Sequence, residues 1–306
     1  MSFIDRALEK TKALKKKNEK KEIIPGPQEP APGLLSAAVG TLPVEQDLVP
    51  QDISYTITHT VAVDRETMRR NRLIFSGVEG QEAVIEAYKV LRTHILHHTK
   101  AQGRNTLMVT GPSRDEGKTL SAINLAISIA QEINQTVLLV DADLRYPSVH
   151  RYFGIQAQAG LVDHLTAGVP ISELLIHPEG LAKLVLLPGG RPTARAPELI
   201  NSPTMKELVQ ELKHYYPNRY VIFDLPPLLT YADALAFAPL MDGIIVVVEA
   251  GETKREDIEQ CQKMLEKFNL LGFVLNKMAP RDHGYQYYYR LETAPAKKFW
   301  LPWIKK

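Results

Sequence analysis

The sequence predicts an α/β fold, a mostly parallel sheet with helices on both faces. Three observations predict it: short continuous apolar runs, amphipathic helical segments that alternate with them, and polar residues of chemical interest directly after the runs. Continuous apolar runs are typical of strands buried on both faces, and such strands belong to parallel sheets covered by helices. Of the 306 residues, 44% are apolar, which is sufficient for an ordinary core. Because ligands bind outside the carboxyl ends of the strands in these sheets, we expect the chemistry there.

The N-terminal part is expected to be a flexible extension made of two segments. Residues 1–22 carry a net charge of +4 and place apolar residues at helical spacing, which predicts a basic amphipathic helix. Residues 23–79 are predicted to be a linker, because the six prolines between residues 23 and 50 exclude a helix there. Residues 51–75 show some alternation of apolar and polar side chains, so a loosely attached strand remains an alternative.

The folded domain is expected over residues 80–279 and begins with a helix whose apolar face spans residues 84–96. The predicted strands and helices follow in chain order: strand 106–110, helix 118–132, strand 136–141, strand 184–188, helix 204–215, strand 220–224, strand 243–249, helix 254–268 and strand 272–276. Residues 280–306 are expected to form a C-terminal tail that is rich in tyrosine at first and basic and aromatic at its end.

A phosphate-binding loop is predicted directly after the strand 106–110. The segment GPSRDEGKT spans Gly111 to Thr119, and a helix follows it. Backbone N–H groups at such a junction bind phosphate oxygens, the lysine reaches the β- and γ-phosphates, and the threonine hydroxyl binds Mg²⁺. The nucleotide-binding residues expected in this loop are Gly111, Ser113, Asp115, Glu116, Gly117, Lys118, Thr119 and Leu120. The fold is therefore predicted to be of the P-loop NTPase type.

Three carboxylates are expected beside this loop, because each follows an apolar strand. Asp141 and Asp143 end the second strand, and they would point the same way if the strand continued through both. Burying both without a cation would be costly, so Mg²⁺ and a nucleophilic hydroxyl are natural partners. Asp224 closes the strand 220–224 and fits a Walker B carboxylate that holds Mg²⁺ through water. Asn276, after the last strand, either borders the adenine or belongs to an ordinary loop.

These motifs together resemble those of the bacterial tyrosine kinases, a P-loop family of exopolysaccharide biosynthesis. The family has a Walker A loop, an apolar strand ending D-x-D-x-R, here Asp141, Asp143 and Arg145, and an apolar strand ending D-x-P-P, here from Asp224. The resemblance covers roughly residues 80–290. The opening FIDRALEKTK is also similar to the start of kinases encoded with exopolysaccharide and exosortase-linked systems. In that family glycine is common at the position of Asp115.

The resemblance implies an ATP- and Mg²⁺-dependent, non-specific protein-tyrosine kinase that phosphorylates itself. The implied catalytic residues are Lys118, Asp141, Asp143 and Asp224; the implied metal-binding residues are Thr119, Asp141 and Asp224; the further nucleotide-binding residues are Arg145 and Asn276. The tyrosine-rich tail of the family is matched here by GYQYYYR, which makes Tyr285, Tyr287, Tyr288 and Tyr289 the expected phosphoacceptors. A packing stripe is the alternative for these four tyrosines.

Ring assembly and a membrane partner are further implications of the resemblance. The family carries an E-x-x-R-x-x-R helix for ring formation, and Glu86, Lys89 and Arg92 occupy those positions, with lysine replacing the first arginine. Lysine lacks the bidentate fork of arginine, which weakens this match. A membrane polysaccharide co-polymerase, the chain-length determinant, is the implied activator. The chain is then expected in the cytoplasm, peripheral at the inner face of the membrane through that partner.

Two other functions remain open from the sequence: a nucleotide-switched ATPase of the partitioning or positioning type, and a non-catalytic regulator of polysaccharide assembly. Those ATPases carry a signature lysine five residues before the P-loop lysine, where this chain has Ser113. The net charge of +2 argues against nucleic acid as a partner. Both ends of the chain are basic, and we expect them to meet an anionic partner such as a membrane surface, or else to be solvated. The single cysteine, Cys261, excludes an internal disulfide.

Overall fold

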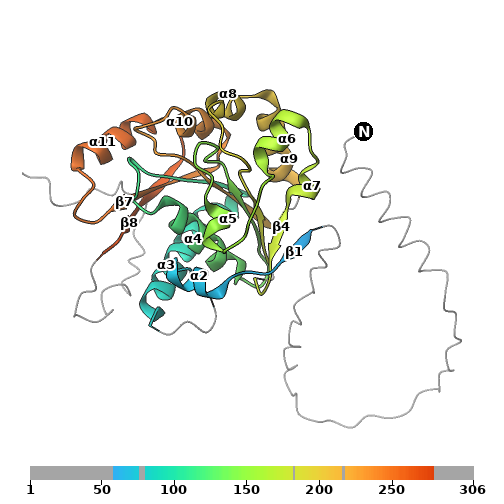
Figure 1. The fold of residues 1–306 in the computed structure, drawn as a ribbon. Helices are drawn as coiled ribbons and strands as arrows, with labels where there is room; N and C mark the ends of the chain where they lie inside the picture. Colours follow the sequence, from blue (N-terminus) through green and yellow to red (C-terminus); the bar gives the residue numbers. More distant parts are fainter. Residues whose placement is uncertain (1–57, 76–79, 182, 216–217, 279–306) are drawn as a thin grey trace, which may run out of the picture. The chain divides into compact units, whose positions relative to one another are not determined.

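The computed structural model describes residues 58–75, 80–181, 183–215 and 218–278 (Figure 1). The predicted helix over residues 1–22 and the tail over residues 280–306 lie outside these residues.

One eight-stranded sheet organises the described residues, with the strand order β1-β4-β5-β3-β6-β2-β7-β8. All neighbouring strands pair in parallel except β4 and β5, which are antiparallel. The strands are β1 (His59–Val61), β2 (Thr106–Thr110), β3 (Thr136–Asp141), β4 (Ile176–Pro178), β5 (Leu184–Leu187), β6 (Arg219–Asp224), β7 (Gly243–Glu249) and β8 (Leu270–Asn276). The prediction of a mostly parallel sheet is confirmed, and every predicted strand is present.

Helices cover both faces of this sheet (Figure 1). Consecutive residues of a strand point to opposite faces, so Met108 enters one apolar core while Leu107 and Val109 enter the other. The core of Met108 lies under α9 (Pro203–Tyr215) and α11 (Arg255–Met264), and the core of Leu107 lies under α3 (Glu82–Thr99) and α4 (Lys118–Ala130). The remaining helices are short: α2 (Arg65–Arg70), α5 (Val149–Tyr152), α6 (Leu161–Ala167), α7 (Ile171–Leu174), α8 (Ala196–Ile200), α10 (Asp233–Phe237), and the 3₁₀ turns η1 (Lys100–Gln102) and η2 (Ala238–Leu240).

The folded domain begins earlier than the sequence predicts. We predicted a linker through residue 79, but β1 pairs with β4, and Met68, Leu73 and Ile74 are fully buried in the core under α4. The side chain of Asn124 on α4 accepts a hydrogen bond from the backbone N–H of Ile74 at 3.0 Å. Residues 58–75 therefore belong to the folded domain and not to a linker, and the strand that remained an alternative within residues 51–75 is present as β1. A strand of three residues and a helix of six are too short to give a recognisable period.

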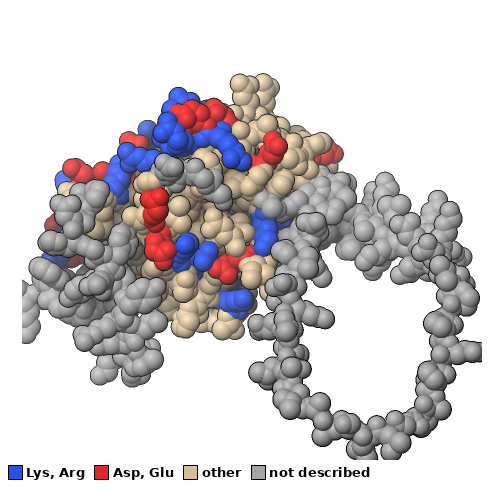
Figure 2. Space-filling model, turned by 90° about the horizontal axis from the view of Figure 1, so that it is seen from below, with Lys and Arg blue, Asp and Glu red and all other residues tan. Residues whose placement is uncertain are grey.

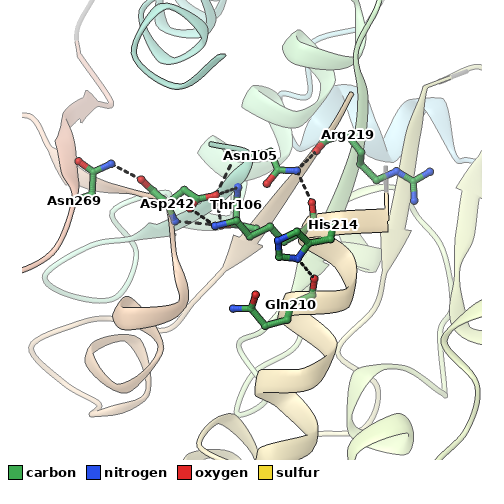
Figure 3. A network of polar contacts seen from close by, with 8 residues as sticks. Asn105, Thr106, Gln210, His214, Arg219, Asp242 and Asn269 are labelled. Atoms are coloured by element: carbon green, nitrogen blue, oxygen red, sulfur yellow. Dashed lines mark hydrogen bonds and ion pairs between the residues drawn. The ribbon is translucent and has the colours of Figure 1, made fainter. Parts of the chain in front are cut away.

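A polar network ties strands together at the edge of the sheet opposite the expected site (Figure 3). The carboxylate of Asp242, just before β7, accepts hydrogen bonds from the backbone N–H groups of Asn105 and Thr106 and from the Thr106 hydroxyl. It also forms an ion pair with Lys213 at the end of α9, and the Asn269 amide donates to the Asp242 carbonyl. This network joins the amino ends of β2, β7 and β8 to the end of α9.

On the face shown in Figure 2, lysine and arginine side chains lie beside aspartate and glutamate, as the near-zero net charge predicts. None of the described helices is long and apolar enough to span a bilayer.

Candidate active site

The P-loop connects β2 to α4 and adopts two left-handed residues. Gly117 has φ +88°, and a Cβ at this position would lie 2.0 Å from the amide nitrogen of Asn276. Asp115 has φ +62°, the region that glycine favours and aspartate tolerates better than most residues. Asp115 therefore holds a backbone conformation that glycine would adopt without strain. Leu120 lies in the first turn of α4 and packs, partly buried, against the core, so only its backbone faces a nucleotide site.

The side chain of Glu116 holds the P-loop in place through hydrogen bonds. Its carboxylate accepts hydrogen bonds from the Ser113 N–H and from the Thr253 hydroxyl, both at 2.9 Å. Its carbonyl accepts a hydrogen bond from the Asn276 amide, also at 2.9 Å. Burial raises the pKa of the Glu116 carboxyl, against the lowering effect of these donors. The side chain of Glu116 thus holds the loop, and nucleotide binding by its backbone N–H stays a prediction.

Lys118 is buried within the loop that it is expected to serve. Its Nζ donates to the Ser113 carbonyl oxygen at 2.6 Å. Burial lowers the pKa of the Lys118 ammonium, although the carboxylates of Asp224 and Glu116 oppose this effect. A lysine held by one carbonyl can exchange that partner for phosphate oxygens, which are stronger acceptors.

Thr119 and Asp224 form the centre of the site. The Thr119 hydroxyl donates to Oδ2 of Asp224 at 2.7 Å, and Oδ1 of the same carboxylate is buried without a partner. Burial raises the pKa of Asp224 to about 7. The P-loop threonine and the Walker B aspartate are thus brought together as predicted.

Asp141 lies beside Asp224, because β3 and β6 pair in register at these two residues. Its Oδ2 accepts hydrogen bonds from the N–H groups of Ser148 and Val149, and its Oδ1 is buried without a partner. Burial, followed by the charge of Asp224, raises the pKa of Asp141 well above its usual value.

Two buried carboxylates, each with one unpaired oxygen, fit a hard cation such as Mg²⁺. Among the described residues, no three His, Cys, Asp or Glu side chains are placed to hold a metal ion by themselves. Phosphate oxygens and water therefore have to complete the coordination, as is usual for Mg²⁺ at nucleotide sites. Thr119, Asp141 and Asp224 are the residues that would hold the ion.

Asp143 differs from Asp141 in its surroundings. The strand ends at Asp141, so the reason for expecting both side chains to point the same way does not apply. Asp143 is partly exposed, and its Oδ1 accepts a hydrogen bond from the Tyr146 N–H at 3.0 Å. Burial raises the pKa of Asp143, and the positive charge of Lys118 acts in the opposite direction.

We predicted that Arg145 would bind the nucleotide, but its guanidinium is already paired within the chain. Its guanidinium forms an ion pair with the buried carboxylate of Asp233 at 2.6 Å and stacks on the ring of Tyr231 at 4.4 Å. Next to it, Arg114 of the P-loop stacks on Tyr146 and contacts Tyr231. Sequence reasoning missed Arg114, Tyr146, Tyr231 and Asp233, and its only available signal was that Arg114 lies inside the P-loop motif.

The three residues expected on a ring-forming helix behave differently from one another. Glu86 and Lys89 form an exposed i,i+3 ion pair on α3 at 3.2 Å. Arg92 is largely buried; it donates to the Ser128 carbonyl and pairs with Glu132 at 2.9 Å, so it fastens α3 to α4 within the chain. The expected phosphoacceptors Tyr285, Tyr287, Tyr288 and Tyr289 lie outside the described residues.

The family profile of the CobQ/CobB/MinD/ParA nucleotide binding domain matches residues 107–302. The chain is 33% identical over 223 residues to tyrosine-protein kinase YwqD of Bacillus subtilis (strain 168), covering 72% of this chain and 92% of that protein. It is 30% identical to the putative tyrosine-protein kinase EpsB of Ralstonia solanacearum, covering 72% of this chain but only 29% of EpsB. The solved kinase domain of Escherichia coli tyrosine kinase ETK matches with a TM-score of 0.62 and 27% identity, over 75% of this chain and 94% of that one.

The P-loop, its two buried carboxylates and these matches define a nucleotide-binding domain of the CobQ/CobB/MinD/ParA class. Within that class, the chain belongs to the family of bacterial tyrosine kinases.

Proposed function

We propose that this chain is an ATP- and Mg²⁺-dependent protein-tyrosine kinase that phosphorylates its own C-terminal tyrosines and regulates exopolysaccharide polymerisation or export. The observation that carries the proposal is the buried Thr119–Asp224 pair beside Asp141, at the mouth of a P-loop. A site of this kind orients a triphosphate, and relatives of the chain are named tyrosine-protein kinases.

The residues divide the work of phosphoryl transfer, which needs positioning and charge stabilisation more than covalent chemistry. Lys118 leaves the Ser113 carbonyl and donates to the β- and γ-phosphate oxygens. Thr119, Asp224 and Asp141 hold the metal side of the triphosphate. When bound, Mg²⁺ supplies positive charge that neutralises the phosphate oxygens.

Asp143 is the carboxylate available to the incoming hydroxyl, because it is partly exposed while Asp141 and Asp224 are buried. The phenolic oxygen bonds to the γ-phosphorus, the bond to the ADP oxygen breaks, and the phenolic proton passes to Asp143. A raised pKa makes this carboxylate a better proton acceptor.

The acceptors we propose are Tyr285, Tyr287, Tyr288 and Tyr289 of a neighbouring copy of the chain, since the tail begins shortly after β8. The exposed pair of Glu86 and Lys89 on α3 would contribute to a ring-like contact. A membrane co-polymerase would activate the kinase and hold it at the inner face of the membrane, with the basic ends contacting the surface.

The test is a phosphotyrosine assay with Mg-ATP on the wild-type chain and on Lys118→Met. We expect the variant to lose phosphotyrosine by at least a hundredfold while melting near the wild-type temperature, because Nζ has one hydrogen bond to lose. The matched control is Lys206→Met, at an exposed position on α9. Phosphate release without phosphotyrosine in the wild type would instead indicate a nucleotide-switched ATPase, and neither signal would indicate a non-catalytic regulator.

A further inference from the structure

Three loops at the carboxyl edge of the sheet meet in a stack of arginine and tyrosine side chains. The P-loop contributes Arg114, the loop after β3 contributes Arg145 and Tyr146, and the loop after β6 contributes Tyr231. Arg145 lies over the Tyr231 ring and Arg114 over the Tyr146 ring, each at 4.4 Å. Arg114 also donates to the Tyr231 hydroxyl at 2.5 Å. We call these four residues the acceptor stack.

The two arginines of the acceptor stack differ in charge compensation. Arg145 is neutralised by the buried carboxylate of Asp233. Arg114 is exposed, and within the described part of the chain it forms no ion pair with a carboxylate. Its partners are phenol groups, which leave its positive charge uncompensated. The guanidinium of Arg114 lowers the pKa of the Tyr146 phenol, as expected for a positive charge beside a phenol.

The acceptor stack lies on the side of the P-loop where the reaction takes place. The strand order places β6 and β3 together on one side of β2, with β7 and β8 on the other. Asp224 and Asp141, the metal-side carboxylates, end β6 and β3. Thr119, Asp224 and Asp141 would hold Mg²⁺ here, and the ion would supply positive charge to the phosphoryl group that is transferred, so the acceptor has to approach from this side.

We propose that Arg114, together with the rings of Tyr146 and Tyr231, is the binding subsite for the acceptor tyrosine of a second copy of the chain. Tyr146 is 56% exposed, so an incoming phenol can reach it. Arg114 exchanges a resident phenol for the acceptor phenol, and its N–H groups then contact the phenolic oxygen during transfer and the phosphate on the product. The bonds made and broken are those of the proposed kinase reaction, on which this inference rests.

The experiment separates acceptor binding from nucleotide binding. The kinase is the full chain with Tyr285, Tyr287, Tyr288 and Tyr289 changed to Phe, and the acceptor is the Lys118→Met chain with its tail intact. Into the kinase we introduce Arg114→Ala, Arg114→Lys or Tyr231→Leu, with Arg69→Ala as a control. Arg69 is exposed on α2 and pairs only locally with Glu66. The readouts are kcat and KM for the acceptor chain, and the Kd of a fluorescent ATP analogue with Mg²⁺.

We expect Arg114→Ala to raise KM for the acceptor by about tenfold or more, which corresponds to the loss of one cation–aromatic or charge-assisted contact. Arg114→Lys restores part of this loss, Tyr231→Leu raises KM as well, and the nucleotide Kd changes less than threefold in all of them. An unchanged KM in Arg114→Ala overturns the proposal, and so does an equal loss of nucleotide affinity, which would make Arg114 a nucleotide ligand. If the kinase with an unaltered acceptor stack transfers no phosphate although it binds the analogue, the kinase function itself fails, and the subsite fails with it.

Discussion

Two carboxylate oxygens, Oδ1 of Asp141 and Oδ1 of Asp224, are buried without hydrogen-bond partners at the edge of the sheet. Such atoms cost stability when no cation is bound, because a buried charge loses its hydration. The two carboxylates of the nucleotide site therefore reduce the stability of the fold.

Asp224→Asn is expected to stabilise the chain when Mg²⁺ and nucleotide are removed, and to abolish Mg²⁺-dependent nucleotide binding. Burial raises the pKa of Asp224 to about 7, so the folded state retains a proton that the unfolded state releases above about pH 4. Stability from this group is present at low pH and is lost as pH rises through about 7. One pKa unit corresponds to about 1.4 kcal/mol, so a shift from about 4 to about 7 gives a cost on the order of 4 kcal/mol at pH 8.

Thermal melts with a chelator check this prediction. The variant should melt several degrees above the wild type at pH 8, and the difference should shrink at pH 5. Glu266→Gln, at an exposed position, is the control and should change neither melt. A variant that is less stable than the wild type at both pH values would contradict the prediction.

The sequence predicts the residues that follow strands better than it predicts how their side chains turn. Thr119 and Asp224 meet as expected because each is fixed to the end of a strand or the start of a helix. The side chain of Glu116 accepts a hydrogen bond from Thr253, 137 residues further along the chain. Arg145 forms an ion pair with Asp233, 88 residues away, and no local sequence pattern predicts such a pair.

At the scale of elements, the segment before α3 is part of the core and not a tether. Asp64 caps α2, and the backbone after it enters the core through Leu73 and Ile74. The strands β2, β3, β5, β6, β7 and β8 and the long helices were predictable because their apolar patterns are long. The antiparallel β4 and the short helices after β3 were not, since elements of a few residues carry no clear period, and β1 was open only as an alternative to a linker.

Leu73→Ala should destabilise the chain by about 2–4 kcal/mol, because a fully buried leucine leaves a cavity when it is shortened. Urea unfolding at neutral pH measures this loss. Ile133→Ala is the control, since Ile133 is 64% exposed. Equal midpoints for the wild type and Leu73→Ala would show that residues 58–75 do not belong to the folded domain.

Asp242→Asn should cost about 1–3 kcal/mol and leave phosphotransfer per folded molecule unchanged, because the network lies at the edge opposite the site. Burial raises the pKa of Asp242, but the hydrogen bonds from Lys213, Asn105 and Thr106 outweigh this and hold it below its usual value. The stabilisation is thus fully present above about pH 4 and is lost as pH falls through the lower folded value.

Urea midpoints of Asp242→Asn against the exposed Glu207→Gln test this prediction at pH 7. A midpoint equal to that of the control would mean that the network contributes nothing to stability, and a selective loss of transfer rate would mean that it reaches the site.

At the scale of the whole molecule, we propose that a neighbouring copy of the chain phosphorylates the tail tyrosines. Mixing a Lys118→Met chain that keeps its tyrosines with an active chain whose four tail tyrosines are Phe should therefore give phosphotyrosine on the inactive chain. The yield should rise with protein concentration, because transfer between molecules is second order. No signal at any concentration would refute transfer between copies.

The strand order also determines when the strands can pair during synthesis. β2 lies between β6 and β7, which leave the ribosome more than a hundred residues later. At about 5–20 residues per second, the strand that carries the P-loop waits several seconds for either neighbour. The entropic cost of closing such long loops comes before strand pairing gives any stabilisation. Topologies of this kind therefore fold slowly. A nucleotide therefore has no complete site on the nascent chain until β6, which ends in Asp224, has been made, so nucleotide binding can stabilise only the late stages of folding.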